Sequence, residues 1–380
     1  MIKVAFIDDG INPEFIPSHI PFDNYTADET GVHLSKPVDN VSHGTMCCQI
    51  FNNNTNTPYH LTSIQVLDNT TGTGSHKALV TALNWCATQD FDLINMSMGT
   101  RQYLDFAPIA AAVGSITKSI IVAACSNNNE LTFPACLPSV IGVRHCNQEE
   151  LIGNFAYLHN PYDQIEVATC VRDEPVSLGE NHIEKMSGAN SFATPLITAR
   201  VCDYIGRGYK TMAAVRKQLE QDSIKNTSFI TYEFYKNRTL NWEECAVPIV
   251  AIPDTAPEAN HKLQALLDVF IQDGYRAIAL SDTTETNATN FIYNLNRHGQ
   301  GKVSLPELIE LYYNFTLPDI LFLQMPMGNF AMLPANMQAD VVVKLPEIGT
   351  GGLESIDVKH IFSIIKPTND LFVEITRALK

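Results

Sequence analysis

The sequence is poor in positive charge and lacks long apolar segments. Among its 380 residues, 25 lysines and arginines stand against 41 aspartates and glutamates, which gives a formal net charge of −16 at pH 7. This excess disfavours nucleic acid and anionic membranes as partners, because both would repel the protein. No run of about eighteen apolar residues occurs, and no signal-peptide pattern precedes the first apolar segment. The sequence therefore predicts neither a membrane span nor secretion.

The cysteines lack the spacing of a metal site and the even number of a disulfide framework. There are 9 of them, and several fall within predicted strands and helices, namely Cys47, Cys48, Cys86, Cys125 and Cys202. Such cysteines are typical of reduced, buried thiols in a reducing compartment. We therefore expect a cytoplasmic protein without disulfides.

Short apolar segments alternate with amphipathic ones over the first part of the chain. Apolar, β-branched segments predict buried strands at Lys3–Ile7, Ser63–Leu67, Asp92–Ser97, Ser119–Cys125 and Val140–Val143. The segments between and after them predict helices at Gly44–Asn52, His76–Thr88, Phe106–Lys118 and Ser191–Ile205. This alternation is typical of βαβ crossovers. The sequence thus predicts an α/β fold with a doubly wound parallel sheet in a domain of residues 1–225.

A second α/β pattern follows a polar, tyrosine-rich connector at residues 226–246. Strands are predicted at PIVAIP (248–253), Arg276–Leu280, Asp319–Gln324 and Asp340–Lys344, with helices near Leu263–Ile271, Leu305–Asn314 and Leu371–Leu379. We expect a smaller α/β domain at 247–380. Its segment PDTAPEANHKLQ is laid out like a phosphate-binding loop with Lys262 near the lysine position, but the glycines that such a loop needs are missing. The domain is loosely similar to accessory proteins of bacterial peptide natural-product maturation clusters.

Three short segments carry reactive side chains in the order Asp, His, Ser. They read VAFIDDGIN at Val4 to Asn12, SHGTM at Ser42 to Met46, and SGANSFATP at Ser187 to Pro195. A serine hydroxyl is a weak nucleophile near neutral pH and needs a base within hydrogen-bond reach. Singly, each residue has a structural explanation, because aspartate and serine often cap helices. Together, the three segments favour nucleophilic catalysis.

These segments resemble the active-site segments of the subtilisin-like serine proteases, the subtilases of peptidase family S8, which follow the same chain order. The resemblance covers about residues 1–220 and implies that family's fold and its hydrolysis of peptide bonds. It assigns His43 as the general base, Asp8 as the group that orients the imidazole, and Ser191 as the nucleophile. Within IDDG, Asp8 directly follows the apolar strand, and Asp9 is then the variable neighbour.

The segment IIVAACSNNN, at Ile120 to Asn129, resembles the family's strand that ends in the oxyanion-hole asparagine. Aligned by its small residues, it assigns this role to Asn127, whose amide would act with the backbone N–H of Ser191. The adjacent amides of Asn128 and Asn129 remain alternatives at this point.

Two more segments resemble parts of the family's substrate cleft. DLINMSMGT is similar to the strand that pairs with substrate, which implies substrate-binding roles for Ser97, Met98 and Gly99. FPACLPSVIGV is similar to the next strand and its lead-in, which makes the Phe133–Pro134 bond a candidate cis peptide.

The chain also departs from the family pattern. Ala189 and Asn190 stand where a glycine and a threonine or serine are usual, and Met46 replaces a second histidine. The segment from Phe51 to Ser63 carries no carboxylate, whereas calcium sites use carboxylate ligands. We therefore expect no metal and no cofactor.

The sequence thus predicts an intracellular serine endopeptidase, restricted to processing a small set of peptides such as the leader of a ribosomally made peptide. Its expected partners are a peptide or protein substrate, with the second domain offering a surface to an accessory protein. The alternative function is a non-catalytic, subtilisin-like peptide-binding protein that acts with a partner. Retention of the candidate residues Asp8, His43, Asn127 and Ser191 favours the enzyme.

Overall fold

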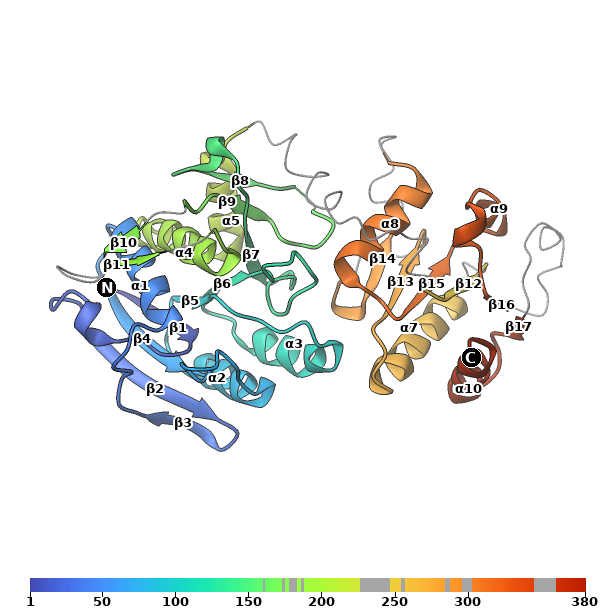
Figure 1. The fold of residues 1–380 in the computed structure, drawn as a ribbon, viewed down its shortest axis with the longest axis horizontal. Helices are drawn as coiled ribbons and strands as arrows, with labels where there is room; N and C mark the ends of the chain where they lie inside the picture. Colours follow the sequence, from blue (N-terminus) through green and yellow to red (C-terminus); the bar gives the residue numbers. More distant parts are fainter. Residues whose placement is uncertain are drawn as a thin grey trace. The chain divides into compact units, whose positions relative to one another are not determined.

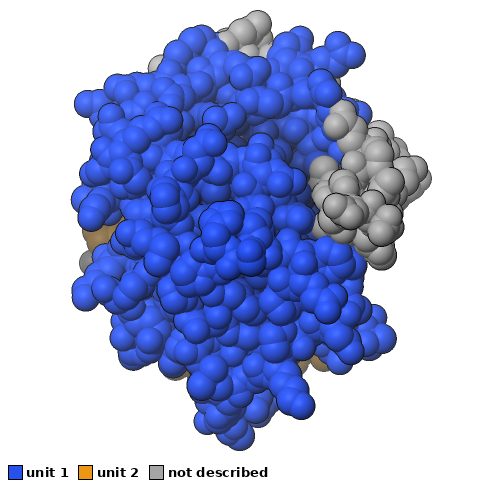
Figure 2. Space-filling model, turned by 90° about the vertical axis from the view of Figure 1, so that its left-hand side faces the viewer, with its two compact units in different colours: residues 1–233 blue, residues 234–380 orange. Residues whose placement is uncertain are grey.

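A computed structural model of the chain describes residues 1–159, 161–172, 175–177, 183–185, 188–225, 247–253, 257–283, 288–295, 303–344 and 360–380. The chain divides into two units, residues 1–233 and 234–380, and Figure 2 shows one face of the first. The expected connector at 226–246 lies outside the described residues, as does Ser187. The expected boundaries of the two domains therefore remain a proposal.

The first unit is built on a nine-stranded sheet with the strand order β3-β2-β4-β1-β5-β6-β7-β9-β8. In that order the strands are Gly31–Leu34, Phe22–Asp28, Tyr59–Gln65, Ile2–Asp8, Leu93–Met96, Ile120–Ala124, Val140–His145, Val167–Thr169 and Phe155–Tyr157. All neighbours pair in parallel except β2 with β3 and β8 with β9, which are antiparallel edges. A small separate ribbon pairs β10 (Pro175–Ser177) with β11 (Ile183–Lys185).

Helices cover both faces of this sheet, as the continuous apolar strands require. Figure 1 shows α1 and α4 on one face and α2 and α3 on the other. The bounds of these helices and of α5 are His43–Asn54, Asn190–Gly206, His76–Thr88, Phe106–Ser115 and Met212–Asp222. Val4 and Phe6 of β1 share one buried cluster with residues of α1 and α4. Successive β1 side chains point to opposite faces, so Ala5 and Ile7, also fully buried, face the other layer.

The predicted α/β class and parallel sheet are confirmed. The long apolar strands and the helices appear within a few residues of the predicted ranges, and the Phe133–Pro134 bond is cis. The hairpin β2–β3, the short strands β8 and β9, and helix α5 were not predicted. In β2, β3 and α5, half-buried or exposed residues outnumber the buried ones, whereas β8 and β9 are mostly buried but only three residues long. None of them therefore has the long continuous apolar run that marks a central strand.

The second unit contains a six-stranded parallel sheet with the order β14-β13-β15-β12-β16-β17. The strands in that order are Ile292–Asn294, Ala277–Ser281, Ile320–Gln324, Ile249–Ile252, Val341–Lys344 and His360–Ser363. Its helices α7, α8, α9 and α10 are Pro257–Gln272, Leu305–Thr316, Met327–Phe330 and Thr368–Ala378. Helices α7 and α10 pack on one face of the sheet, and α8 lies on the side of the sheet away from α7 (Figure 1).

Local chemistry explains two features of this unit. A capping box starts α8, since the Ser304 hydroxyl accepts from the N–H of Glu307 and the Glu307 carboxylate accepts from the N–H of Ser304. On α7, the ammonium of Lys262 donates to the carbonyl of Lys366 at 2.7 Å, so this lysine ties the helix to the segment before α10. Among the described residues, no helix is both long and apolar enough to cross a membrane.

The core of the second unit should depend on Phe322 of β15. This side chain is fully buried, and its ring meets the edge of Phe270 of α7 at a centroid distance of 5.5 Å. We expect Phe322→Ala to lower the free energy of unfolding by about 3–5 kcal/mol in a urea titration followed by circular dichroism. Val373→Ala on α10 is the control, because Val373 is 48% exposed. Equal midpoints for the two variants would contradict this packing.

Candidate active site

The carboxyl end of β1 meets the amino end of α1, and the contact brings Asp8 to His43. The Nδ1–H of His43 donates to Oδ1 of Asp8 at 2.9 Å. His43 is the first residue of α1, which Ser42 caps by accepting from the N–H of Thr45. Gly44 permits the close approach, since a Cβ there would lie 2.5 Å from the carbonyl oxygen of Gly10. The SHGT sequence thus starts the helix directly against the end of β1.

Asp9 fixes the same junction from its other side. Its carboxylate accepts from the backbone N–H groups of His43 at 3.0 Å and Gly44 at 2.7 Å. Both donors belong to the first turn of α1, where N–H groups lack intrahelical partners and a negative charge is favoured. The interpretation of Asp9 as a merely variable neighbour therefore missed a positioning role. The sequence signal that could have indicated this role was the second carboxylate, Asp9, directly before Gly10.

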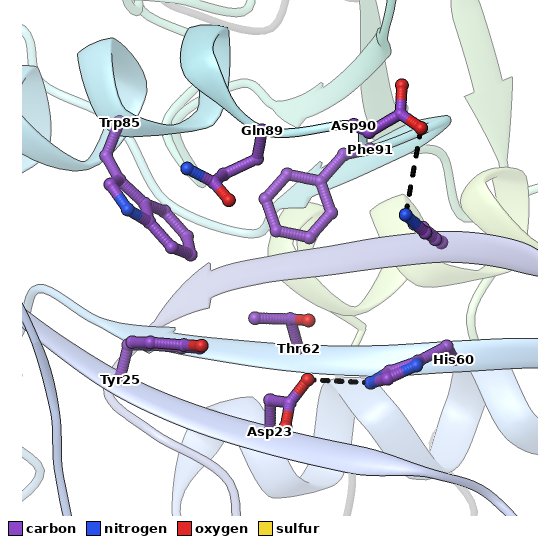
Figure 3. A pocket seen from close by; sticks show the side chains of 9 residues that line it. Asp23, Tyr25, His60, Thr62, Trp85, Gln89, Asp90 and Phe91 are labelled. Carbon is purple, nitrogen blue, oxygen red and sulfur yellow. Dashed lines mark hydrogen bonds and ion pairs between the residues drawn. The ribbon is translucent and has the colours of Figure 1, made fainter.

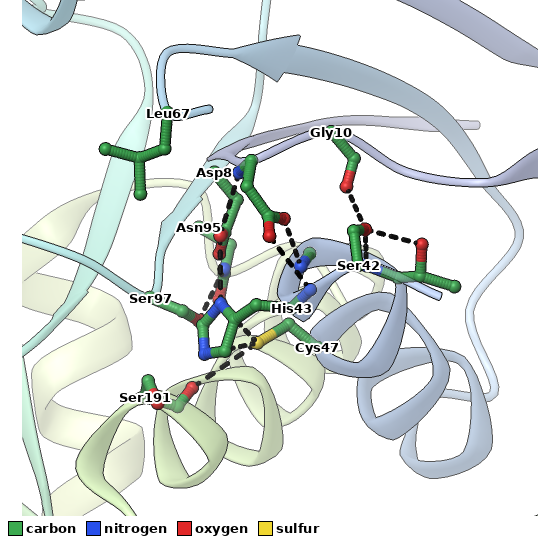
Figure 4. Close-up of polar contacts among 12 residues, drawn as sticks. Asp8, Gly10, Ser42, His43, Cys47, Leu67, Asn95, Ser97 and Ser191 are labelled. Atoms are coloured by element: carbon green, nitrogen blue, oxygen red, sulfur yellow. Dashed lines mark hydrogen bonds and ion pairs between the residues drawn. The ribbon is translucent and has the colours of Figure 1, made fainter. Parts of the chain in front are cut away.

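Ser191 lies in the first turn of α4, and the side chain of Cys47 connects it to His43 (Figure 4). The thiol of Cys47, one helical turn after His43, donates to the carbonyl of Ser191 at 3.6 Å and lies 3.8 Å from Nε2 of His43. The ring of Phe192 packs beside the His43 imidazole at a centroid distance of 5.2 Å. No hydrogen bond joins His43 to the hydroxyl of Ser191, both of which are described residues. Such bonds often close only when substrate is bound.

The electrostatics of the site make the His43 imidazole a stronger base than a free imidazole. Burial lowers the pKa of His43, but the charge of the Asp8 carboxylate raises it by more, so the pKa lies above its usual value. Burial raises the pKa of Cys47, which keeps this side chain a thiol. Asp8 is 1% exposed, so water screens its pairing with His43 little.

The structure distinguishes among the three adjacent asparagines. Oδ1 of Asn127 accepts from the backbone N–H of Asn190 at 2.9 Å, which leaves its Nδ2 as the outward donor beside the start of α4. Asn128 instead donates to Glu130, and Asn129 accepts from Cys125 with its backbone at a φ of 54°. Within the described residues, the Asn127 Nδ2 group and the N–H of Ser191 have no partner. Two free donors therefore lie at the helix terminus.

The predicted substrate-binding residues Ser97, Met98 and Gly99 follow the carboxyl end of β5, the neighbour of β1. Chain connections leave β1 and β5 in opposite directions, and such a switch point is where open α/β sheets hold their ligands. Ser97 is buried, whereas Met98 is half-buried and Gly99 exposed. Gly99 lies against another backbone, because a Cβ there would be 2.6 Å from the carbonyl oxygen of Phe133.

Sequence reasoning missed a row of buried polar side chains that are hydrogen-bonded to one another next to the site. The Ser97 hydroxyl accepts from Nδ2 of Asn95 at 3.1 Å, and the Thr198 hydroxyl of α4 donates to Oδ1 of Asn95 at 2.8 Å. Asn95 and Thr198 are fully buried, so unpaired amide or hydroxyl groups there would cost free energy. These bonds fix α4 against β5. An asparagine inside an apolar strand was the only signal.

Asp8, His43 and Cys47 also form the one group of metal-ligand type found among the described residues, with candidate ligand atoms within 4.8 Å of one another. The hydrogen bond between Nδ1 of His43 and Oδ1 of Asp8 already uses two of these atoms. An ion would have to replace that bond, so we assign the group no metal.

A separate pocket of about 160 Å³ lies at the amino ends of the strands of unit 1 (Figure 3). Its charged groups are paired with one another: Nε2 of His60 lies 2.8 Å from Asp23, and Nζ of Lys3 lies 3.7 Å from Asp90. Asp8 and Ser97 lie at the carboxyl ends of β1 and β5, which is the opposite edge of the sheet. We assign this pocket no part in the candidate site.

Comparisons with known proteins show the family to which the chain belongs. The sequence model of the Subtilase family matches residues 1–227. Among solved structures, a cold-adapted subtilisin-like serine proteinase aligns with a TM-score of 0.46 at 17% identity, covering 60% of this chain and 85% of that one. A lanthipeptide protease aligns at 0.43 and 17%, covering 58% and 78%. The nisin leader peptidase NisP of Lactococcus lactis aligns at 0.42 and 15%, covering 58% and 81%. No curated protein matches the chain.

The junction predicts a pH-dependent effect of Asp9→Asn. An amide can accept from only one of the two N–H groups, so we expect a loss of about 1–3 kcal/mol in the free energy of unfolding. Burial and the Asp8 charge raise the pKa of Asp9 above 3.8. The pH-dependent part of the Asp9 contribution to the free energy of unfolding is therefore fully present below pH 3.8. It is lost as the pH rises through the raised pKa. The stability deficit of Asp9→Asn should narrow with rising pH in urea titrations.

Asp28→Asn is the control with the opposite sign. Hydrogen bonds from the side chain and backbone of Thr30 lower the pKa of Asp28, so its contribution is present above pH 3.8 and is lost as the pH falls. The deficit of Asp28→Asn should widen with rising pH. Deficits that change in the same direction for both variants would contradict the burial of Asp9 at the junction.

Proposed function

The chain belongs to the subtilase family of serine proteases, and on that premise we propose that it is an endopeptidase whose catalytic triad is Asp8, His43 and Ser191. The observation that carries the proposal is the 2.9 Å bond between Nδ1 of His43 and Asp8, with Ser191 held nearby in the first turn of α4. This bond fixes the imidazole tautomer that leaves Nε2 free to accept a proton.

The proposed reaction proceeds by acyl transfer. Oγ of Ser191 attacks the peptide carbonyl while Nε2 of His43 takes the hydroxyl proton, and Asp8 stabilises the imidazolium. The oxyanion receives hydrogen bonds from Nδ2 of Asn127 and the backbone N–H of Ser191. His43 then gives its proton to the leaving amine, and the C–N bond breaks. His43 then takes a proton from a water molecule, which attacks the acyl carbon. The ester C–O bond breaks, His43 returns the proton to Oγ of Ser191, and the carboxyl product leaves.

We place the substrate among peptides rather than small esters, and we propose processing of a restricted set. Met98 and Gly99, at the end of β5, offer accessible backbone for pairing with an extended peptide. The net charge of −16 favours cationic peptides by long-range attraction. The second unit, with its own sheet and core, gives such a substrate or an accessory protein a further surface.

A cytoplasmic location is part of the same proposal. The eight cysteines that lie in the described residues are all free and buried. Free thiols in this number are typical of proteins kept in reducing compartments.

Labelling with a fluorophosphonate tests the nucleophile. We expect intact-protein mass spectrometry to detect a single adduct on the wild type and none on Ser191→Ala, because only an activated hydroxyl reacts readily. Ser139→Ala is the matched control, since Ser139 is exposed and lies outside the site, and it should label like the wild type. A folded wild type that takes no label would refute the catalytic assignment and favour the peptide-binding alternative.

The pH dependence of labelling tests the base. The pKa of His43 lies above its usual 6.5, so the neutral imidazole forms only at higher pH. The labelling rate should therefore rise with pH, and the midpoint of this rise should lie above 6.5. Asp8→Asn should move this midpoint downward and slow labelling by about 10⁴-fold, the cost known for amidation of a triad aspartate. Asp23→Asn, which affects His60 in the separate pocket, should leave the profile unchanged. An unshifted midpoint in Asp8→Asn would exclude Asp8 as the partner of the base.

A further inference from the structure

Asn190, directly before Ser191, is buried and hydrogen-bonded through both its side chain and its backbone. It is only 4% exposed. Its Oδ1 accepts from the backbone N–H of His145 at 2.6 Å, and its Nδ2 donates to the carbonyl of Ser126. Its backbone N–H donates to Oδ1 of Asn127. One residue therefore joins the ends of β6 and β7 to the start of α4.

A carboxamide suits this position because it accepts at one end and donates at the other. The two groups that it contacts need these two functions, since one is an N–H donor and the other is a carbonyl acceptor. A hydroxyl is too short to reach both segments at once, and an alanine would leave both buried groups without their present partner. The chemistry of Asn190 is thus matched to the two strand ends that it connects.

The bond to Ser126 controls the direction of the next side chain, that of Asn127. The Ser126 carbonyl belongs to the peptide group that leads into Asn127, so fixing it sets the rotation of that peptide. The N–H of Ser126 is fixed as well, by donation to the Thr132 hydroxyl at 2.8 Å. With Oδ1 of Asn127 held by the Asn190 N–H, the orientation of Nδ2 is determined at both ends.

The end of β7 supports the segment before Asn190 from another side. The ring of His145 lies against Gly188, where a Cβ would be 2.6 Å from Nε2 of the ring. Nδ1 of His145 accepts from the backbone N–H of Val171 at 3.1 Å, which fixes the ring. The hydrogen bond from the His145 backbone to Asn190 therefore comes from a residue that is itself held in place, so it can fix the position of the Asn190 side chain.

We infer that Asn190 is a positioning residue that aligns the Nδ2 donor of Asn127 with the N–H of Ser191, and so sets the geometry of the oxyanion hole. This inference rests on the proposed function. Asn190 acts through Asn127 and touches no reacting atom itself. The role goes beyond filling the tight start of a helix, for which any small residue would serve.

The test is the kinetics of inactivation by a fluorophosphonate, measured as the maximal rate kinact and the half-saturating concentration KI. We expect Asn190→Ala to lower kinact by about 10²-fold, the cost typical of a misplacement of about 1 Å, while KI stays within about twofold. Asn154→Ala is the control, because Asn154 is exposed and its amide makes one local bond to Glu150. It should leave both constants unchanged.

A double-mutant cycle separates this role from general structural support. Asn127→Ala should lower kinact by about 10²–10³-fold, and adding Asn190→Ala should slow it little further, because the donor that Asn190 aligns is already gone. Losses that multiply in the double variant would overturn the inference. So would an unchanged kinact in folded Asn190→Ala.

Asn190→Asp covers the case in which the alanine variant does not fold. The carboxyl has the same shape and donates to the Ser126 carbonyl only when protonated, so the kinact of this variant relative to the wild type should fall as the pH rises. A ratio that does not change with pH would overturn the inference. If the wild type itself takes no label, the proposed function fails first, which distinguishes the two failures.

Discussion

The site depends on the contact between the end of β1 and the start of α1, where two adjacent carboxylates meet one helix terminus. Asp8 accepts from the imidazole of His43, and Asp9 accepts from the first N–H groups of the helix that carries it. One carboxylate therefore orients the ring and the other fixes the backbone beneath it. Two buried negative charges side by side repel each other, and the positive end of the α1 dipole offsets that repulsion.

The second helix terminus of the site is held differently. The cap of α4 is Ala189, whose side chain makes no capping hydrogen bond. The first N–H groups of the helix therefore have no local side-chain partner. Asn127 accepts from one of them, whereas the N–H of Ser191 stays available. A helix with an ordinary side-chain cap would use its own N–H groups locally. Here they are left for groups that come from other strands, which suits a site that stabilises a developing negative charge.

Much of the fold was predictable because parallel strands are buried on both faces and so appear as apolar runs. The strands β1, β5, β6 and β7 and helix α2 follow from such runs and from helical periodicity. The edge hairpin β2–β3 was not predictable in this way, since one of its faces is open to water and its apolar residues are few. The second unit followed the same rule. Its edge strand β17 was missed for the same reason, whereas β14 is mostly buried but only three residues long, which is too short a run to mark a strand.

The sequence by itself determined the α/β class, the family, and the three segments that carry Asp8, His43 and Ser191, because these are local properties of apolar runs and short motifs. Only the tertiary structure distinguished Asn127 from its neighbours, and only it revealed Asp9, Cys47, Asn95 and Asn190 as contacts of the site. These residues act through hydrogen bonds to segments far away in the chain. Such bonds follow from where the strands end in space, and no local pattern encodes that.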